Sequence, residues 1–73
     1  MDRTEILLIE KYIRQDEELK KHVTAHRKLE AVLEEFNQRR YLTPEAQTER
    51  KNLQKLKLRE KETIIKILDK YQQ

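Results

Sequence analysis

The sequence contains no glycine, cysteine, serine or tryptophan, and its only proline is Pro44. Because cysteine is absent, disulfide bonds and thiolate metal sites are excluded, and we expect a reducing, cytoplasmic location. The absence of glycine excludes a glycine-rich phosphate loop. With neither serine nor cysteine as a nucleophile, and with no predicted cleft, we expect no enzymatic activity.

Long hydrophobic runs are also missing. No window approaches the roughly 18 apolar residues of a membrane span. The apolar cluster Ile6–Ile9 is broken by Glu10 and Lys11, and it is too short for the core of a signal peptide. We therefore expect no membrane insertion.

Charge dominates what is present, since 42% of the residues are charged and 36% are hydrophobic. Residues 1–38 carry seven basic and nine acidic side chains, a net charge of −2, whereas residues 39–73 carry ten and five, a net charge of +5. Two such segments attract each other when they lie side by side, with a modest energy that salt weakens. A chain this short buries little core by itself, which favours a partner.

The segment Tyr41-Leu42-Thr43-Pro44-Glu45 is typical of a helix start. It offers a threonine cap, a proline for the first helical position and an acid in the first turn. We therefore predict one all-α domain over residues 1–73, an antiparallel two-helix hairpin that resembles a coiled coil. Its predicted elements are a helix at about 3–40, a corner at 41–43 and a helix at about 44–71.

Apolar residues recur at helical spacing before the corner. Asp2, followed by Glu5, is typical of a helix N-terminus. Asp16 interrupts the apolar stripe, and Asp16-Glu17-Glu18 is itself typical of a second helix start. The sequence leaves open whether the first helix is continuous or breaks near 15–16 to leave a short bent N-terminal helix.

The second helix has an apolar stripe that we expect to face the first helix: Ala46, Leu53, Leu56, Ile64, Ile67, Leu68 and Tyr71. Leu58 and Ile65 lie off this line and widen the apolar surface. A helix of this length spans roughly 40 Å at ~1.5 Å per residue, so Tyr71 should reach about the level of Arg14. Residues 1–13 then lack a neighbour, and they must either fold back on the hairpin or contact another subunit.

Self-association, as a dimer or a higher oligomer, follows from this apolar excess, and contact with another protein stays open. The predicted function is a non-enzymatic module for protein–protein interaction and oligomerisation. The residues that we expect to carry self-association are Ile6, Ile9, Ile13, Leu19, Val23, Leu33, Leu58, Ile65 and Leu68.

The alternative function is nucleic-acid association through the basic face of the second helix. Its candidate residues are Lys51, Lys55, Arg59, Lys66 and Lys70. Such a row can follow a line of phosphates, but acidic residues are mixed into it, and no recognition-helix motif is present.

The two histidines, His22 and His26, lie one helical turn apart and share a face. A zincin pattern would need glutamate at position 23, where Val23 stands, although Glu18 or Glu30 could supply a further ligand. We predict neither a metal site nor a cofactor.

Four segments together form a pattern that covers most of the chain: Asp16–Lys20, His26–Glu30, Tyr41–Glu45 and Leu53–Lys61. With them, from about Ile9 onward, the chain resembles the YdcH-like family of small bacterial proteins. The resemblance implies a helical hairpin that can oligomerise. It implies no activity, because the family is a domain of unknown function.

Overall fold

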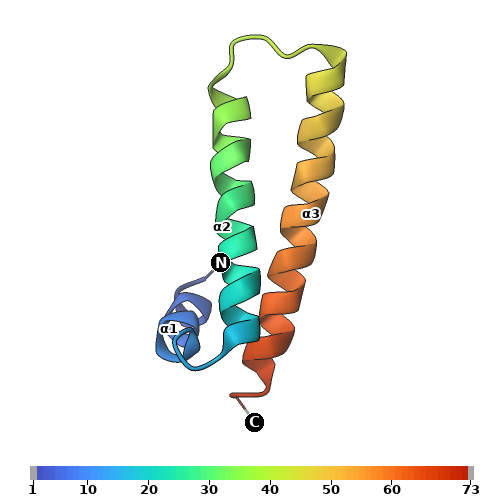
Figure 1. Cartoon of the computed structure of the whole chain (residues 1–73). Helices are drawn as coiled ribbons and strands as arrows, with labels where there is room; N and C mark the ends of the chain where they lie inside the picture. The colour runs from blue at the N-terminus through green and yellow to red at the C-terminus, as the bar shows by residue number, and fades with distance from the viewer. Residues whose placement is uncertain (1, 73) are drawn as a thin grey trace.

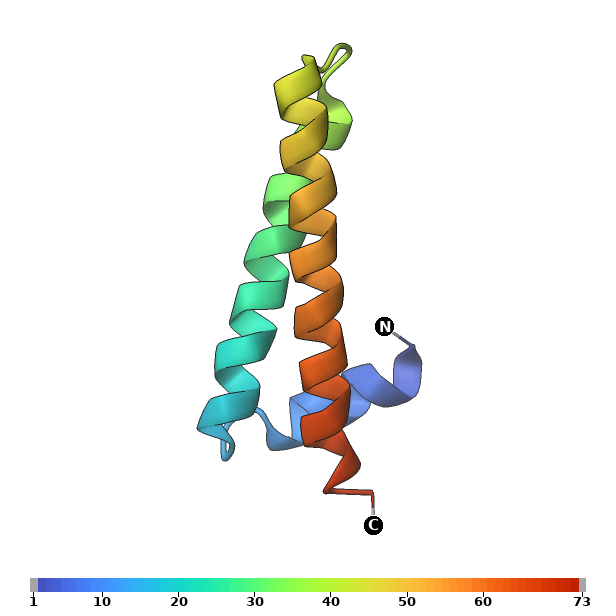
Figure 2. The ribbon, with the colours of Figure 1, turned by 90° about the vertical axis from the view of Figure 1, so that its right-hand side faces the viewer.

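The computed structural model of the chain describes residues 2–72, and within that range it has three helices and no strand. The helices are α1 (Arg3–Tyr12), α2 (Glu17–Gln38) and α3 (Pro44–Asp69). Helices α2 and α3 run antiparallel, side by side, and α1 crosses the open end of this hairpin (Figures 1 and 2). The molecule measures 45 × 20 × 17 Å. The all-α prediction and the packing of the two long helices are thus confirmed.

Each helix begins with a capping side chain. Asp2, Asp16 and Thr43 accept a hydrogen bond from the backbone N–H three residues on, at 2.9, 3.0 and 3.1 Å. These bonds satisfy N–H groups that have no partner inside the helix. Pro44 occupies the start of α3, where its missing N–H costs nothing.

The helix is interrupted between α1 and α2 because the Asp16 side chain replaces a backbone carbonyl as hydrogen-bond acceptor. In a continuous helix the N–H of Leu19 would donate to the carbonyl of Gln15, but here it donates to Asp16 Oδ1. The backbone of Asp16 is extended, with φ −121° and ψ 101°. The expected helix at about 3–40 is therefore two helices, and the open alternative of a bent N-terminal helix is the one found.

The Asp16 carboxylate is buried, and it reaches across to the end of α3. Its Oδ2 accepts a hydrogen bond from the Tyr71 hydroxyl and lies 3.0 Å from Lys70 Nζ. The hydrogen bond from Tyr71, with those from the Leu19 N–H and Lys70, lowers the pKa of Asp16 to about 2. One ionised carboxylate thus joins the start of α2 to the C-terminal end of α3.

Tyr71 also stacks on Tyr12, the last residue of α1. Their ring centroids are 3.9 Å apart, and the ring planes differ by 10°. Together with the hydrogen bond to Asp16, this contact places Tyr71 beside the junction of α1 and α2, close to the level of Arg14 that the length of the second helix predicts. It also fixes the place where α1 meets α3.

The main core lies where the three helices meet. Six buried side chains form it, and four partly buried ones pack against it: Ile9, Leu19, Val23, Ile64, Ile67 and Leu68, with Leu8, Tyr12, Ile13 and Tyr71. Leu33 and Phe36 are buried separately, nearer the corner. Residues 1–13 were expected either to fold back on the hairpin or to contact another subunit. The structure has the first arrangement, since α1 packs on the hairpin of the same chain.

The prediction that Leu56 belongs to the apolar stripe facing the first helix is wrong. Leu56 is 46% exposed, whereas its neighbour Lys57 is half-buried. Counting back seven residues from the buried Ile64 gives Lys57, which is almost in phase after two helical turns, whereas Leu56 is displaced by about 80°. The interface between α2 and α3 is therefore polar in its middle.

We predict that Thr43→Ala lowers the free energy of unfolding by about 1 kcal/mol, because the N–H of Ala46 loses its acceptor. Thr48→Ala is the matched control, since Thr48 is exposed within α3 and only donates to the Pro44 carbonyl. Denaturant unfolding of both variants measures the effect. Equal stabilities of the two variants would mean that the Thr43 cap does not stabilise α3.

We predict that acid weakens the fold through Asp16. Its pKa is lower in the folded chain than its ordinary value of 3.8, so its stabilising effect is complete above that pH and is lost as the pH falls to about 2. Asp16→Asn keeps a capping side chain but removes the titration. Thermal melts between pH 5 and 2 should therefore fall less steeply for Asp16→Asn than for the exposed control Asp69→Asn. Parallel pH profiles would contradict this role.

Candidate functional site

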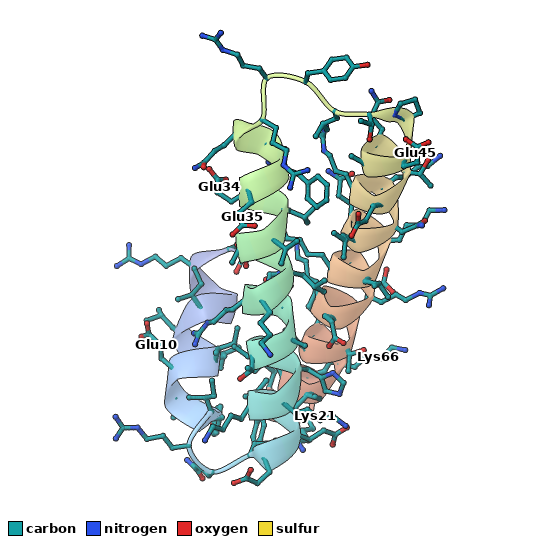
Figure 3. The ribbon with its side chains drawn as sticks, turned by 45° about the horizontal axis from the view of Figure 1, so that its top comes forward. Glu10, Lys21, Glu34, Glu35, Glu45 and Lys66 are labelled. Carbon is teal, nitrogen blue, oxygen red and sulfur yellow. The ribbon has the colours of Figure 1, made fainter. Side chains whose placement is uncertain are left out.

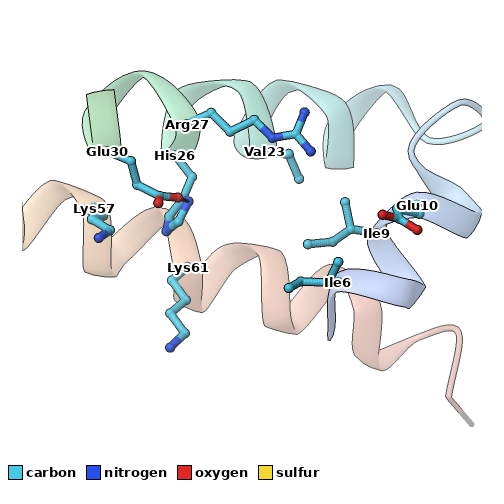
Figure 4. A pocket seen from close by; sticks show the side chains of 9 residues that line it. All are labelled: Ile6, Ile9, Glu10, Val23, His26, Arg27, Glu30, Lys57 and Lys61. Carbon is cyan, nitrogen blue, oxygen red and sulfur yellow. Dashed lines mark ion pairs between the residues drawn. The ribbon is translucent and has the colours of Figure 1, made fainter. Parts of the chain in front are cut away.

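A groove of about 320 Å³ lies where α1 meets the hairpin (Figure 4). Its apolar part is formed by Ile6 and Ile9 from α1 and by Val23 from α2. Ile9 and Val23 belong to the core, whereas Ile6 is 46% exposed. One end of the groove is therefore an extension of the hydrophobic core that stays open to solvent.

The rest of the groove is polar and carries more positive than negative charge. Arg27, Lys57 and Lys61 provide the cations, and Glu10 and Glu30 provide the carboxylates. Lys57 and Lys61 are one turn apart on α3 and both are half-buried, so their aliphatic stems cover part of the interface. The groove suits an amphipathic partner with apolar and acidic groups.

His26 lies between the apolar and the charged parts of the groove. It is 7% exposed, and its Nδ1 lies 2.8 Å from Glu30 Oε1. Burial lowers the pKa of His26 below its ordinary value of 6.5; Glu30 opposes this shift, while Lys57 and Lys61 add to it. The imidazole is thus neutral near pH 7, and Nδ1–H is the donor that suits the Glu30 carboxylate.

His22 connects the two long helices instead of joining His26. Its Nδ1 lies 2.6 Å from Glu60 Oε2 on α3, and both side chains are partly exposed. The two histidines therefore use different glutamates. Among residues 2–72 no three histidine or carboxylate side chains are placed to hold one metal ion.

The residues predicted for self-association divide into two groups. Those buried within the chain are Ile9, Leu19, Val23, Leu33 and Leu68, and Ile13 is half-buried. They pack inside the monomer because α1 folds back on the hairpin. Only Ile6, Leu58 and Ile65 are exposed, at 46%, 56% and 40%, so only these present substantial surface to a second chain.

Leu58 extends the groove along α3. A neighbouring hollow shares His26, Lys57 and Lys61 with the groove and includes Leu58 in its lining. Ile65 instead borders a small hollow with Leu8, on another side of α1. Ile6 and Leu58 therefore flank one continuous surface, which α1 is too short to cover.

The predicted basic row on α3 is exposed throughout, at Lys51, Lys55, Arg59, Lys66 and Lys70. Figure 3 shows Lys66 on the outside of the hairpin. Lys70 is engaged with Asp16, whose hydrogen bond raises the pKa of this lysine. Nucleic-acid binding by this row stays a prediction.

Sequence reasoning missed the polar part of the groove. None of Arg27, Lys57 and Lys61 is among the site residues that the sequence predicts. The helical phase of Leu53 and Ile64 is the signal that places Lys57 at the interface. The crossing position of α1, which closes one side of the groove, has no comparable signal in the sequence.

Neither protein-family models nor searches of curated proteins and solved structures give a match to this chain. The resemblance to the YdcH-like family therefore stays a prediction. None of the helices within residues 2–72 has the length and apolar character that crossing a membrane requires.

We predict that the protein loses stability below pH 6.5 because of His26. Its pKa is lower in the folded chain, so the unfolded chain binds more protons and stability falls as the pH drops below the ordinary value of 6.5. Thermal melts at pH 7.5 and 5.5 measure this decrease. His26→Gln should reduce it, whereas the control His22→Gln, which leaves His26 in place, should keep it. An unchanged decrease in His26→Gln would exclude His26 as its source.

Proposed function

We propose that this chain is a non-enzymatic protein–protein interaction module that associates with a second copy of itself. The observation that carries the proposal is the open surface flanked by Ile6 and Leu58, which continues from the core and which no side chain of residues 2–72 covers. Large apolar side chains beside a groove favour a contact with another protein.

The small size of the core supports the same proposal. Among the residues that the structure describes, eight apolar side chains are buried. The middle of the helix interface adds little apolar burial, because His22, Glu60 and Lys57 occupy it. A domain of this size commonly gains the stability that it lacks by oligomerisation.

Charge complementarity favours a second copy as the partner. The N-terminal half has a net charge of −2 and the C-terminal half +5. Glu34 and Glu35 project from the side of α2 that faces away from α3 (Figure 3), whereas Lys57 and Lys61 line the groove. In a two-fold symmetric pair, an acidic surface of each copy can meet the basic groove of the other. The resemblance to the YdcH-like family implies the same kind of assembly.

We predict that Leu58→Gln weakens the dimer by about ten-fold or more, since burying a leucine contributes roughly 1.5–3 kcal/mol and 1.4 kcal/mol is a factor of ten. Glutamine keeps the helix propensity and adds no charge. Sedimentation equilibrium over a range of protein concentrations measures the dissociation constant.

Leu56→Gln is the matched control. Leu56 lies on the same helix and is 46% exposed, but it does not line the groove. This variant should dimerise like the original chain. A chain that is monomeric at millimolar concentration would exclude self-association, and equal weakening by both variants would exclude the groove as its site.

A further inference from the structure

A second hollow, of about 460 Å³, lies at the closed end of the hairpin. Four cationic side chains line it, together with two glutamines and Leu42, and no carboxylate does: Arg39, Arg40, Arg50 and Lys51. Arg39 and Arg40 come from the corner, which in the structure is the segment 39–43 between α2 and α3. Arg50 and Lys51 come from α3, between one and two helical turns beyond its start. The turn of the chain thus concentrates positive charge that is scattered in the sequence.

No carboxylate of the fold neutralises these four charges by an ion pair in the described residues. Within residues 2–72 none of them forms a salt bridge, since the ion pairs there involve His22, His26 and Lys70. The Nε of Arg50 is buried and has no hydrogen-bond acceptor. A buried guanidinium N–H without an acceptor is costly unless a ligand satisfies it, and Arg is suited to phosphate oxygens.

No carboxylate lines the hollow, although Glu45 and Glu49 belong to the same part of α3. Glu34 and Glu35, near the end of α2, project away from α3 (Figure 3). Arg39 lies over the Phe36 ring at 4.8 Å, a contact that orients its guanidinium without cancelling its charge. The hollow therefore keeps a local excess of positive charge that attracts a polyanion.

Tyr41 is an exposed aromatic residue of the same corner, although its side chain does not line the hollow itself. It is 77% exposed, more than any other large apolar side chain in the described residues. It follows Arg40 and precedes Leu42, and both of these line the hollow. Cations that hold phosphates beside an exposed ring on which a base can stack are the combination that binds single-stranded nucleic acid.

We propose that the corner binds single-stranded nucleic acid, with phosphates held by Arg40, Arg50 and Lys51 and a base stacked on Tyr41. This site differs from the basic row along α3, with which it shares only Lys51, and it does not depend on self-association. Leu58→Gln should therefore bind nucleic acid like the original chain.

The test is fluorescence polarisation with labelled 12-nucleotide single strands of DNA and RNA, titrated with the full chain between 50 and 300 mM salt. The double variant Arg40→Gln/Lys51→Gln should bind at least ten-fold more weakly. It should also lower the salt slope by about 1.4, since each phosphate contact with a single strand contributes about 0.7. The control Lys20→Gln/Lys21→Gln removes two exposed charges from α2, away from the corner, and should lose much less affinity.

Tyr41→Ala tests the stacking step and should weaken binding by about ten-fold, whereas Tyr41→Phe should keep it. Circular dichroism checks that each variant folds, as expected for exposed side chains. The proposal is overturned if no single strand binds at 50 mM salt, if the control loses as much affinity as the corner variant, or if Tyr41→Ala has no effect. Equal affinity for a duplex of the same length would likewise overturn it.

Discussion

The position of all three helices depends on the ionised carboxylate of Asp16. It caps the N-terminus of α2, so the helical backbone of α1 does not continue through it. It also accepts a hydrogen bond from the Tyr71 hydroxyl and pairs with the Lys70 ammonium at the end of α3. Tyr71 lies 55 residues from Asp16 in the sequence. A buried carboxylate is costly unless such donors surround it, so the same group that stabilises this junction also specifies its geometry.

The crossing of α1 decides which apolar surface is buried and which stays open. Because α1 turns back at Asp16, Ile9 joins the core and Tyr12 stacks on Tyr71. A helix of ten residues covers only the open end of the hairpin, and the surface around Leu58 lies beyond its reach. The groove is thus a consequence of the length and angle of α1.

The two proposed surfaces use different physical forces. Association through Ile6 and Leu58 depends mainly on burying apolar area, which salt does not weaken, and salt screens only its contacts between acidic and basic side chains. Binding at the corner depends on phosphate contacts, which weaken steeply as salt rises. The two surfaces have different linings apart from Gln54, so one chain can use both. Raising the salt concentration should therefore weaken nucleic-acid binding at the corner far more than it weakens self-association.

The sequence by itself determined the elements that depend on local chemistry. The caps at Asp2 and Thr43 bond to N–H groups three residues away, so these two helix starts can be predicted from the sequence, whereas the start at Asp16 stayed one of two alternatives. Only the tertiary structure decided where α1 lies and that Arg39 and Arg50 share a hollow, whereas the place of Lys57 follows from its helical phase. Those two features depend on the crossing angle of α1 and on the path of the corner, to which residues distant in the sequence contribute.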